Sequence, residues 1–164
     1  MLDKEAKITM DELLLEIEKF RNWAKTADKS FGEWETEYLH WDRIYRLVNM
    51  LVDASPVGKW SSDLLNDFLY ILARDNECEI IIDTLIENPS QLLSLAKHSV
   101  SFPDHDARWQ IAYGLGEISE NSKEIKTLLN QFSLDEFEYV RRRASFAYEN
   151  SVILKFMNDY MSPS

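Results

Sequence analysis

The chain has 164 residues, of which 45% are hydrophobic and 29% are charged, a balance typical of a globular protein in water. Its formal net charge of −11 repels nucleic acids and anionic membrane surfaces and attracts cationic partners. Its single cysteine excludes an internal disulfide bond.

The sequence also indicates where in the cell the protein is expected. No apolar run approaches the ~18–20 residues that are needed to cross a bilayer. The charged start, Met1 to Lys7, leads directly into an amphipathic pattern and shows no signal peptide. We therefore expect a single domain over residues 1–164, located in the cytoplasm, with neither a membrane nor a nucleic acid as partner.

Apolar spacing predicts helices along almost the whole chain. We expect a first helix to begin at Thr9, where Glu12 completes a capping box, and a second, longer helix over residues 31–54, ending before Pro56. The apolar seam of the second helix advances in steps of three and four residues: Trp34, Tyr38, Trp41, Tyr45, Val48 and Val52. These two longer helices, within residues 1–60, would form an N-terminal pair that caps the rest of the fold.

After residue 60 the predicted helices become shorter. Their expected ranges are 61–74, 76–87, 89–98, 104–119, 122–132, 135–149 and 151–160. Cys78 alternates with isoleucines, and we expect it in the core. No strand is expected, so the sequence predicts an all-α fold.

Two stretches repeat a pattern at an offset of 33 residues, which lies in the range of stacked helical repeats. The aligned pairs are Ala107 with Val140, Arg108 with Arg141, Ile111 with Ala144, and Gly114 with Ala147. An acidic loop containing Asp104 and Asp106 precedes the first stretch. Small residues at helical spacing allow two helix backbones to approach closely, as stacked helix pairs require.

On these residues the chain resembles HEAT-like repeat proteins, well over residues 89–160 and loosely over 61–88. The resemblance implies a short right-handed α–α superhelix over residues 61–160, preceded by the two longer helices. It also implies that Asp104, Asp106, Arg108 and Arg141 fasten neighbouring repeats to one another.

The negative charge is concentrated in residues 61–107, which carry nine acidic and two basic side chains. Glu79, Asp83 and Glu87 recur every four residues on one expected helix, and Asp63 and Asp67 do so on the preceding one. Like charges at this spacing destabilise an isolated helix by about 0.2–0.5 kcal/mol per pair. Two interpretations stay open: a solvated acidic face, or a docking surface for a basic protein partner.

No catalytic residue, metal site or cofactor is predicted. Asp104, His105 and Asp106 offer ligand atoms, but we interpret them as a helix N-cap. In the only basic cluster, we interpret Arg141 as a buttress between repeats, with Arg142 and Arg143 solvated.

These features favour a non-catalytic, acidic protein-binding module. The most specific hypothesis is an immunity protein of a bacterial toxin system, which binds and neutralises a basic toxin domain. The alternative is a structural or regulatory HEAT-like scaffold or adaptor, for which the aromatic N-terminal helices would form the recognition surface. An enzyme built on a repeat scaffold is the third hypothesis.

Overall fold

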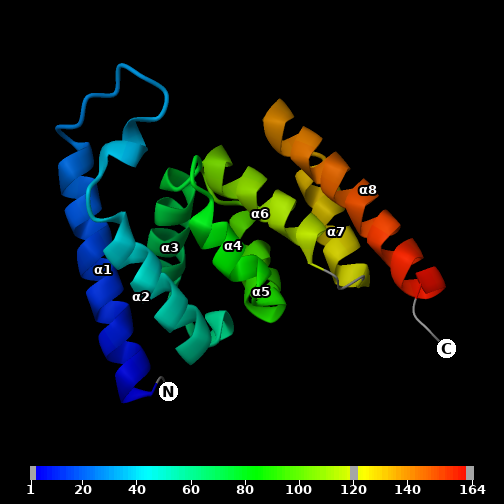
Figure 1. Cartoon of the computed structure of the whole chain (residues 1–164), viewed down its shortest axis with the longest axis horizontal. Coiled ribbons are helices and arrows are strands. Elements are labelled where there is room, and N and C mark those ends of the chain that lie inside the picture. The colour runs from blue at the N-terminus through cyan, green and yellow to red at the C-terminus, as the bar shows by residue number, and fades with distance from the viewer. Residues whose placement is uncertain (1–2, 119–121, 162–164) are drawn as a thin grey trace.

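The computed structural model describes residues 3–118 and 122–161, and it contains helices but no strand within those ranges (Figure 1). The all-α prediction is therefore confirmed. In chain order the elements are α1 (Lys4–Ala24), the short 3-10 helix η1 (Trp34–Glu37), α2 (Trp41–Ala54), the 3-10 helix η2 (Val57–Lys59), α3 (Ser62–Arg74), α4 (Ile80–Ile86), α5 (Pro89–Ser99), α6 (His105–Glu117), α7 (Lys123–Phe132) and α8 (Glu138–Met161).

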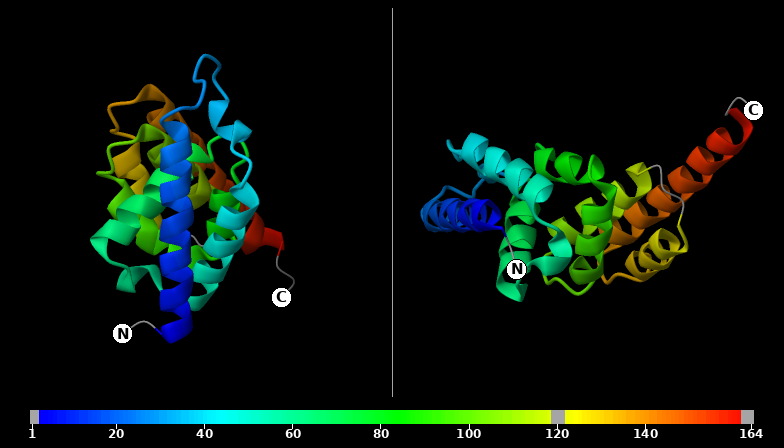
Figure 2. Two further views of the ribbon diagram at one scale, coloured as in Figure 1. Left: turned by 90° about the vertical axis from the view of Figure 1, so that its left-hand side faces the viewer. Right: turned by 90° about the horizontal axis from the view of Figure 1, so that it is seen from below.

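The helices lie in two rows, with α1 at one end of the molecule and α8 at the other (Figures 1 and 2). In one row α2 contacts α4, α4 contacts α6, and α6 contacts α8. In the other row α1 contacts α3, α3 contacts α5, and α5 contacts α7. The hydrophobic core extends along both rows, from Leu13 on α1 to Ala147 on α8.

The 33-residue offset reappears in the contacts of the aligned arginines. Nη1 of Arg108 donates to the carbonyl oxygens of Phe102 and Pro103, at 2.6 and 3.0 Å. Nη1 of Arg141 donates to the carbonyl oxygens 33 residues further on, those of Asp135 and Glu136, at 2.7 and 2.9 Å. Each arginine thus closes the loop that precedes its own helix.

The N-terminal region differs from the prediction. Helix α1 begins at Lys4 rather than at Thr9, because the Asp3 carboxylate caps it by accepting a hydrogen bond from the backbone N–H of Glu5. Thr9 is buried inside the helix, and its hydroxyl donates to the carbonyl of Glu5. The predicted capping box at Thr9 and Glu12 is therefore wrong.

The expected helix over residues 31–54 is also wrong, since the chain forms only the turn η1 before α2 begins at Trp41. The backbone is extended at Tyr38, and the indole N–H of Trp41 donates to the carbonyl of Glu35 at 2.8 Å. This bend brings the rings of Tyr38 and Trp41 to 5.0 and 5.1 Å from that of Phe20. The packing of these two rings against α1 is thus the reason that residues 31–40 do not form a straight helix with α2.

Two further helix boundaries differ from expectation. The helices predicted over 135–149 and 151–160 are one continuous helix, α8, which is the longest in the described chain. Two polar residues at the predicted break form hydrogen bonds while the helix continues: the Asn150 amide donates to the Gly116 carbonyl at 2.8 Å, and the Ser151 hydroxyl donates to the Tyr148 carbonyl. The Asn150 side chain therefore bonds to the neighbouring helix α6, and the Ser151 side chain bonds within α8.

Helix α4 begins at Ile80, four residues later than predicted. The preceding turn ends at Glu79, whose φ of 57° lies in the left-handed region. The turn leaves Cys78 exposed, so its expected place in the core is wrong. The predicted helices that begin after Ser61 and Ser122 are confirmed, and both serine hydroxyls accept the expected backbone N–H groups.

Candidate functional site

Arg74 connects the acidic residues at the start of α6 to the N-terminal helices. Its guanidinium lies 2.6 Å from a carboxylate oxygen of Asp104, 3.6 Å from one of Asp106, and 3.2 Å from one of Glu35. Burial raises the pKa of Glu35, and the charge of Arg74 opposes that effect only in part. This network binds three elements together at one edge of the molecule.

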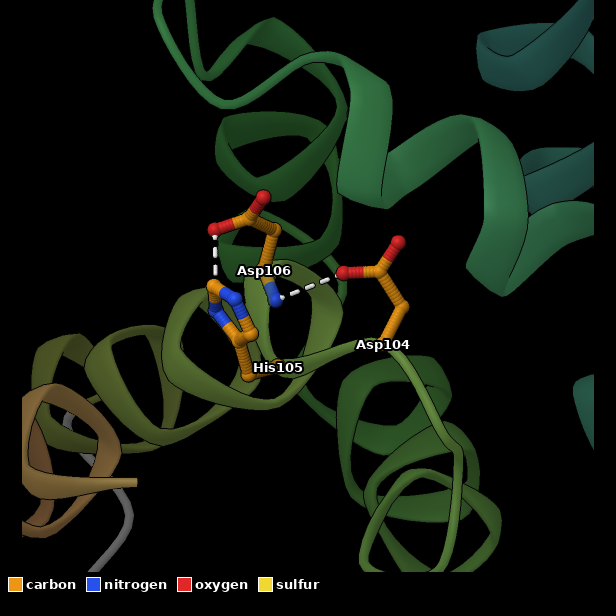
Figure 3. Close-up of side chains that lie close together, drawn as sticks. All are labelled: Asp104, His105 and Asp106. Atoms are coloured by element: carbon orange, nitrogen blue, oxygen red, sulfur yellow. Dashed lines mark hydrogen bonds and ion pairs between the residues drawn. The ribbon is translucent and has the colours of Figure 1, made fainter.

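Asp104 also caps α6, because its carboxylate accepts a hydrogen bond from the backbone N–H of Asp106 at 2.9 Å (Figure 3). Ligand atoms of Asp104, His105 and Asp106 lie within 4.8 Å of one another. The guanidinium of Arg74 already supplies a positive charge to both carboxylates. The arrangement is a helix cap neutralised by arginine, and this geometry gives no independent support for a metal ion.

Arg108 joins two successive loops. Its guanidinium lies 2.7 Å from the Asp135 carboxylate, and both side chains are buried. Burial raises the pKa of Asp135, but hydrogen bonds from Arg108 and from the Phe137 N–H, together with the arginine charge, outweigh it and hold the pKa below its usual value. Among the described residues, the Arg141 side chain bonds only the carbonyls of its own loop, so its contacts differ from those of the expected buttress between repeats.

The five acidic residues expected to bind a partner do not share one helix row. Asp63 and Asp67 lie on α3, and Asp67 forms an ion pair with Arg21 at 2.5 Å. Asp83 and Glu87 lie at α4, in the other row, and are exposed. Glu79 precedes α4 and is half-buried, so the expected stack of three carboxylates on one helix is wrong. Within the described residues, Asp63, Asp83 and Glu87 form no ion pair.

Two surface hollows are lined by residues of α6 and α8, and the second of them also by the turn that precedes α4. The first, of about 280 Å³, lies between α6 and α8 and is lined by Tyr113, Glu117, Arg143, Phe146, Ala147 and Asn150. The second, of about 340 Å³, is lined by Asn76, Glu77, Glu79, Asp106, Trp109 and Tyr139. We call the two together the α4–α8 groove.

Arg143 lines the first hollow and packs against aromatic rings that line both. Its guanidinium carbon is 5.1, 5.3 and 5.4 Å from the ring centroids of Trp109, Tyr113 and Tyr139. The side chain is half-buried, and its Nε has no hydrogen-bond partner in the described chain. The prediction that Arg143 is solvated is therefore wrong, whereas Arg142 is exposed as expected.

Carboxylates outnumber cations around Tyr113. Burial raises the pKa of Tyr113, and the charges of Glu117, Asp83 and Glu79 raise it further, against the single opposing charge of Arg143. The pKa of Glu79 is itself raised, first by burial and then by neighbouring carboxylates that include Asp83. Aromatic rings surrounded by excess negative charge can receive a cationic side chain.

Sequence reasoning found Asp83 and Glu79 but missed the aromatic part of this groove. Trp109 and Tyr113 stand four residues apart on α6, a spacing that places them on one face of the helix. That spacing was the available signal. Nothing local indicates that Arg143, thirty residues beyond Tyr113, packs against them.

Comparison of the chain with protein-family models, with curated proteins and with solved structures gives no match. None of the helices in the described ranges combines the length and the apolar composition that a membrane crossing needs.

One buried carboxylate, Asp75, lies outside the groove. It accepts hydrogen bonds from the Tyr45 hydroxyl at 2.6 Å and from the backbone N–H of Ile81 at 2.8 Å. Burial raises its pKa from 3.8 to about 6, although these hydrogen bonds oppose the rise. Both carboxylate oxygens are engaged in fixing the start of α4 against α2, which is a structural role.

Replacing Asp75 with Asn is expected to remove a pH dependence of stability. Because the pKa is higher in the folded chain, the protonated carboxyl stabilises the fold below pH ~4, and this contribution is lost as the pH rises through about 6. The wild type should lose about 2–3 kcal/mol relative to D75N over that interval. Urea unfolding of both proteins between these pH values measures the difference; parallel curves would contradict the buried, proton-binding role.

Proposed function

We propose that the protein is a non-catalytic protein-binding module that uses the α4–α8 groove to bind a basic segment of a protein partner. The observation that carries this proposal is the hollow in which Tyr113 lies beside Glu117 and Arg143. The charges of Glu117, Asp83 and Glu79 all act on Tyr113, and Arg143 opposes them. Exposed Phe146 adds apolar surface beside these charges. A lysine or arginine of the partner would gain both electrostatic attraction and contact with the rings.

The scaffold that we propose is a HEAT-like α–α superhelix. Its support is the match of Arg108 and Arg141, which bond loop carbonyls at the same 33-residue offset that relates their sequences. The two rows of helices agree with such a stack. A rigid stack would hold the groove carboxylates in fixed positions before the partner arrives, which lowers the entropic cost of binding.

As the specific role we propose an immunity protein that neutralises a basic toxin domain. A chain of 164 residues with a net charge of −11 suits a partner that it must meet quickly, because opposite charges raise association rates. Co-expression with a basic toxin domain encoded beside its gene tests this role. Restored growth is expected; a toxin that stays fully active despite the protein's presence would contradict the immunity role and leave the binding module standing.

Neutralising Asp83 and Glu117 together, as D83N/E117Q, is expected to weaken binding of a Lys- and Arg-rich peptide about tenfold. The reason is that the charges of both carboxylates act on Tyr113, and Glu117 also lines the hollow beside that residue. Isothermal titration calorimetry at low and at physiological salt measures the affinities and their salt dependence.

The matched control neutralises two exposed carboxylates of the other row, as D11N/D63N. It changes the net charge by the same amount, so a general electrostatic effect would be equal in both variants. We expect the control to retain the affinity within about twofold. Equal losses would overturn the assignment to the groove, and failure of the wild type to bind the peptide would overturn the proposal itself.

The aromatic N-terminal region is less suited to be the recognition surface of an adaptor. Trp41 is buried, and Trp34 is partly buried where it stacks on Trp23 with ring centroids 5.8 Å apart. These rings pack around Phe20 and hold α1 against the following turn. Their apolar surface is therefore largely used within the fold.

A further inference from the structure

Helix α8 exposes an extended apolar surface over its C-terminal half. Phe156 is 61% exposed and Tyr160 is 75% exposed. We call the whole set the α8 stripe: Phe146, Val152, Ile153, Phe156, Met157, Tyr160 and Met161, all of them exposed. This half of α8 projects from the body of the molecule (Figure 2).

Most of the stripe lies on the side of α8 opposite to its buried residues. The buried residues of the helix, Val140, Ala144, Ala147 and Ser151, advance in steps of four and three and mark the side that packs on the body. A second set of residues also shares one side of the helix: Phe146, Ile153, Phe156 and Tyr160. The set begins at Phe146, which lies two residues beyond Ala144. At about 100° per residue, a two-residue offset places them on the opposite side.

The other outer helices have polar exposed surfaces. The exposed residues of α7, at the same end of the molecule, are all polar: Lys123, Glu124, Thr127, Asn130 and Gln131. On α1, at the far end, the exposed residues are polar except for Ile8 and Leu15. A stack of helical repeats needs polar outer faces at its ends to stay soluble. The outer surface of α8 departs from this rule, which indicates that it is covered.

We propose that the α8 stripe pairs with the α8 stripe of a second copy of this chain, forming a two-fold symmetric dimer. The exposed area of the stripe is on the order of 700 Å² per copy, close to the ~800 Å² per partner of a standard stable interface. Over residues 146–161 the only charged side chains are Glu149, Lys155 and Asp159. Two copies that each carry a charge of −11 meet here at a nearly neutral surface.

This pairing has a salt dependence opposite to that of the groove. Two copies with a net charge of −11 repel each other, and salt screens that repulsion. Dimerisation is therefore expected to strengthen as salt is added, whereas binding of a basic peptide in the groove weakens. The two proposals can fail independently, because the stripe meets the hollow beside Tyr113 only at Phe146, and the residues of the stripe from Val152 onward do not line that hollow.

Sedimentation velocity of the full chain tests the proposal. We expect the wild type to be largely dimeric at about 50 µM, and Phe156→Glu to raise the dimer dissociation constant at least about 30-fold, as loss of a buried aromatic anchor does. The control is Leu134→Glu, which places the same charge at a residue that is 85% exposed and outside the stripe. Circular dichroism of each variant establishes that it is folded. A monomeric wild type up to about 200 µM would overturn the dimer.

Cysteine cross-linking provides a second measurement that does not depend on a disruptive substitution. In a Cys78→Ser background, Phe156→Cys is expected to form an inter-copy disulfide on mild oxidation, because residues near a two-fold axis meet their own counterparts. Leu134→Cys is expected not to do so. Equal cross-linking of both variants would overturn the two-fold arrangement, as would binding of the wild type to anionic lipid vesicles through the stripe in place of dimerisation.

Discussion

Replacing Arg108 with Met is expected to lower the free energy of unfolding by about 3–5 kcal/mol, because the change leaves the buried carboxylate of Asp135 without its partner. The two side chains are only 4% and 7% exposed, and their closest atoms are 2.7 Å apart. The substitution also removes the donor to the carbonyls of Phe102 and Pro103. Urea unfolding at neutral pH, followed by tryptophan fluorescence, measures the loss.

The matched control is Arg141→Met, which removes the arginine at the equivalent repeat position. Arg141 is half-buried and bonds two loop carbonyls, and its charge is only the last of the causes that lower the pKa of Asp135, so we expect a loss of about 1 kcal/mol. A third variant, Arg108→Met with Asp135→Asn, should recover part of the loss because no buried charge remains. Equal losses for the two single variants would contradict the ion pair as the source of the effect.

The sequence was informative where the determining contacts are local. The cap at Ser61 bonds a backbone N–H three residues away, and the cap at Asp104 bonds one two residues away, so both helix starts follow from short motifs. Apolar spacing then located α3, α5, α6 and α7. The same reasoning failed at residues 31–40, because the chain there follows the packing of Tyr38 and Trp41 around Phe20.

The candidate site depends on contacts between distant residues, and only its acidic part was predictable. The spacing of Glu79, Asp83 and Glu87 suggested one helical face, but Asp75 is held by Tyr45, thirty residues earlier, and starts α4 after Glu79. In a similar way Arg143 reaches the ring of Tyr113 from another helix. Periodicity identifies the residues that share an element, and tertiary packing decides which elements meet.

Gly116→Ala is expected to lower the free energy of unfolding by about 3 kcal/mol or more, because α6 and α8 cannot approach with a methyl group between them. A Cβ at Gly116 would lie 2.6 Å from the Cα of Ala147, a backbone atom that moves only with its helix. Separating the helices would also stretch the hydrogen bond from the Asn150 amide to the Gly116 carbonyl. Thermal and urea unfolding both report the loss.

The matched control, Gly114→Ala, lies two residues earlier on α6, and its Cβ would meet different neighbours. A Cβ there would meet side-chain atoms and no backbone: the Cδ1 of Ile82 at 2.8 Å, and the Cγ1 of Ile82 and the Cδ2 of Leu92 at 3.2 Å. The helix propensity of alanine exceeds that of glycine by about 1 kcal/mol at either position, and it offsets most of this smaller cost. We therefore expect G114A to differ from the wild type by less than about 1 kcal/mol. If G116A were as stable as G114A, α6 and α8 would have to be free to separate. The contact between these two helices, which line the groove, would then not be rigid.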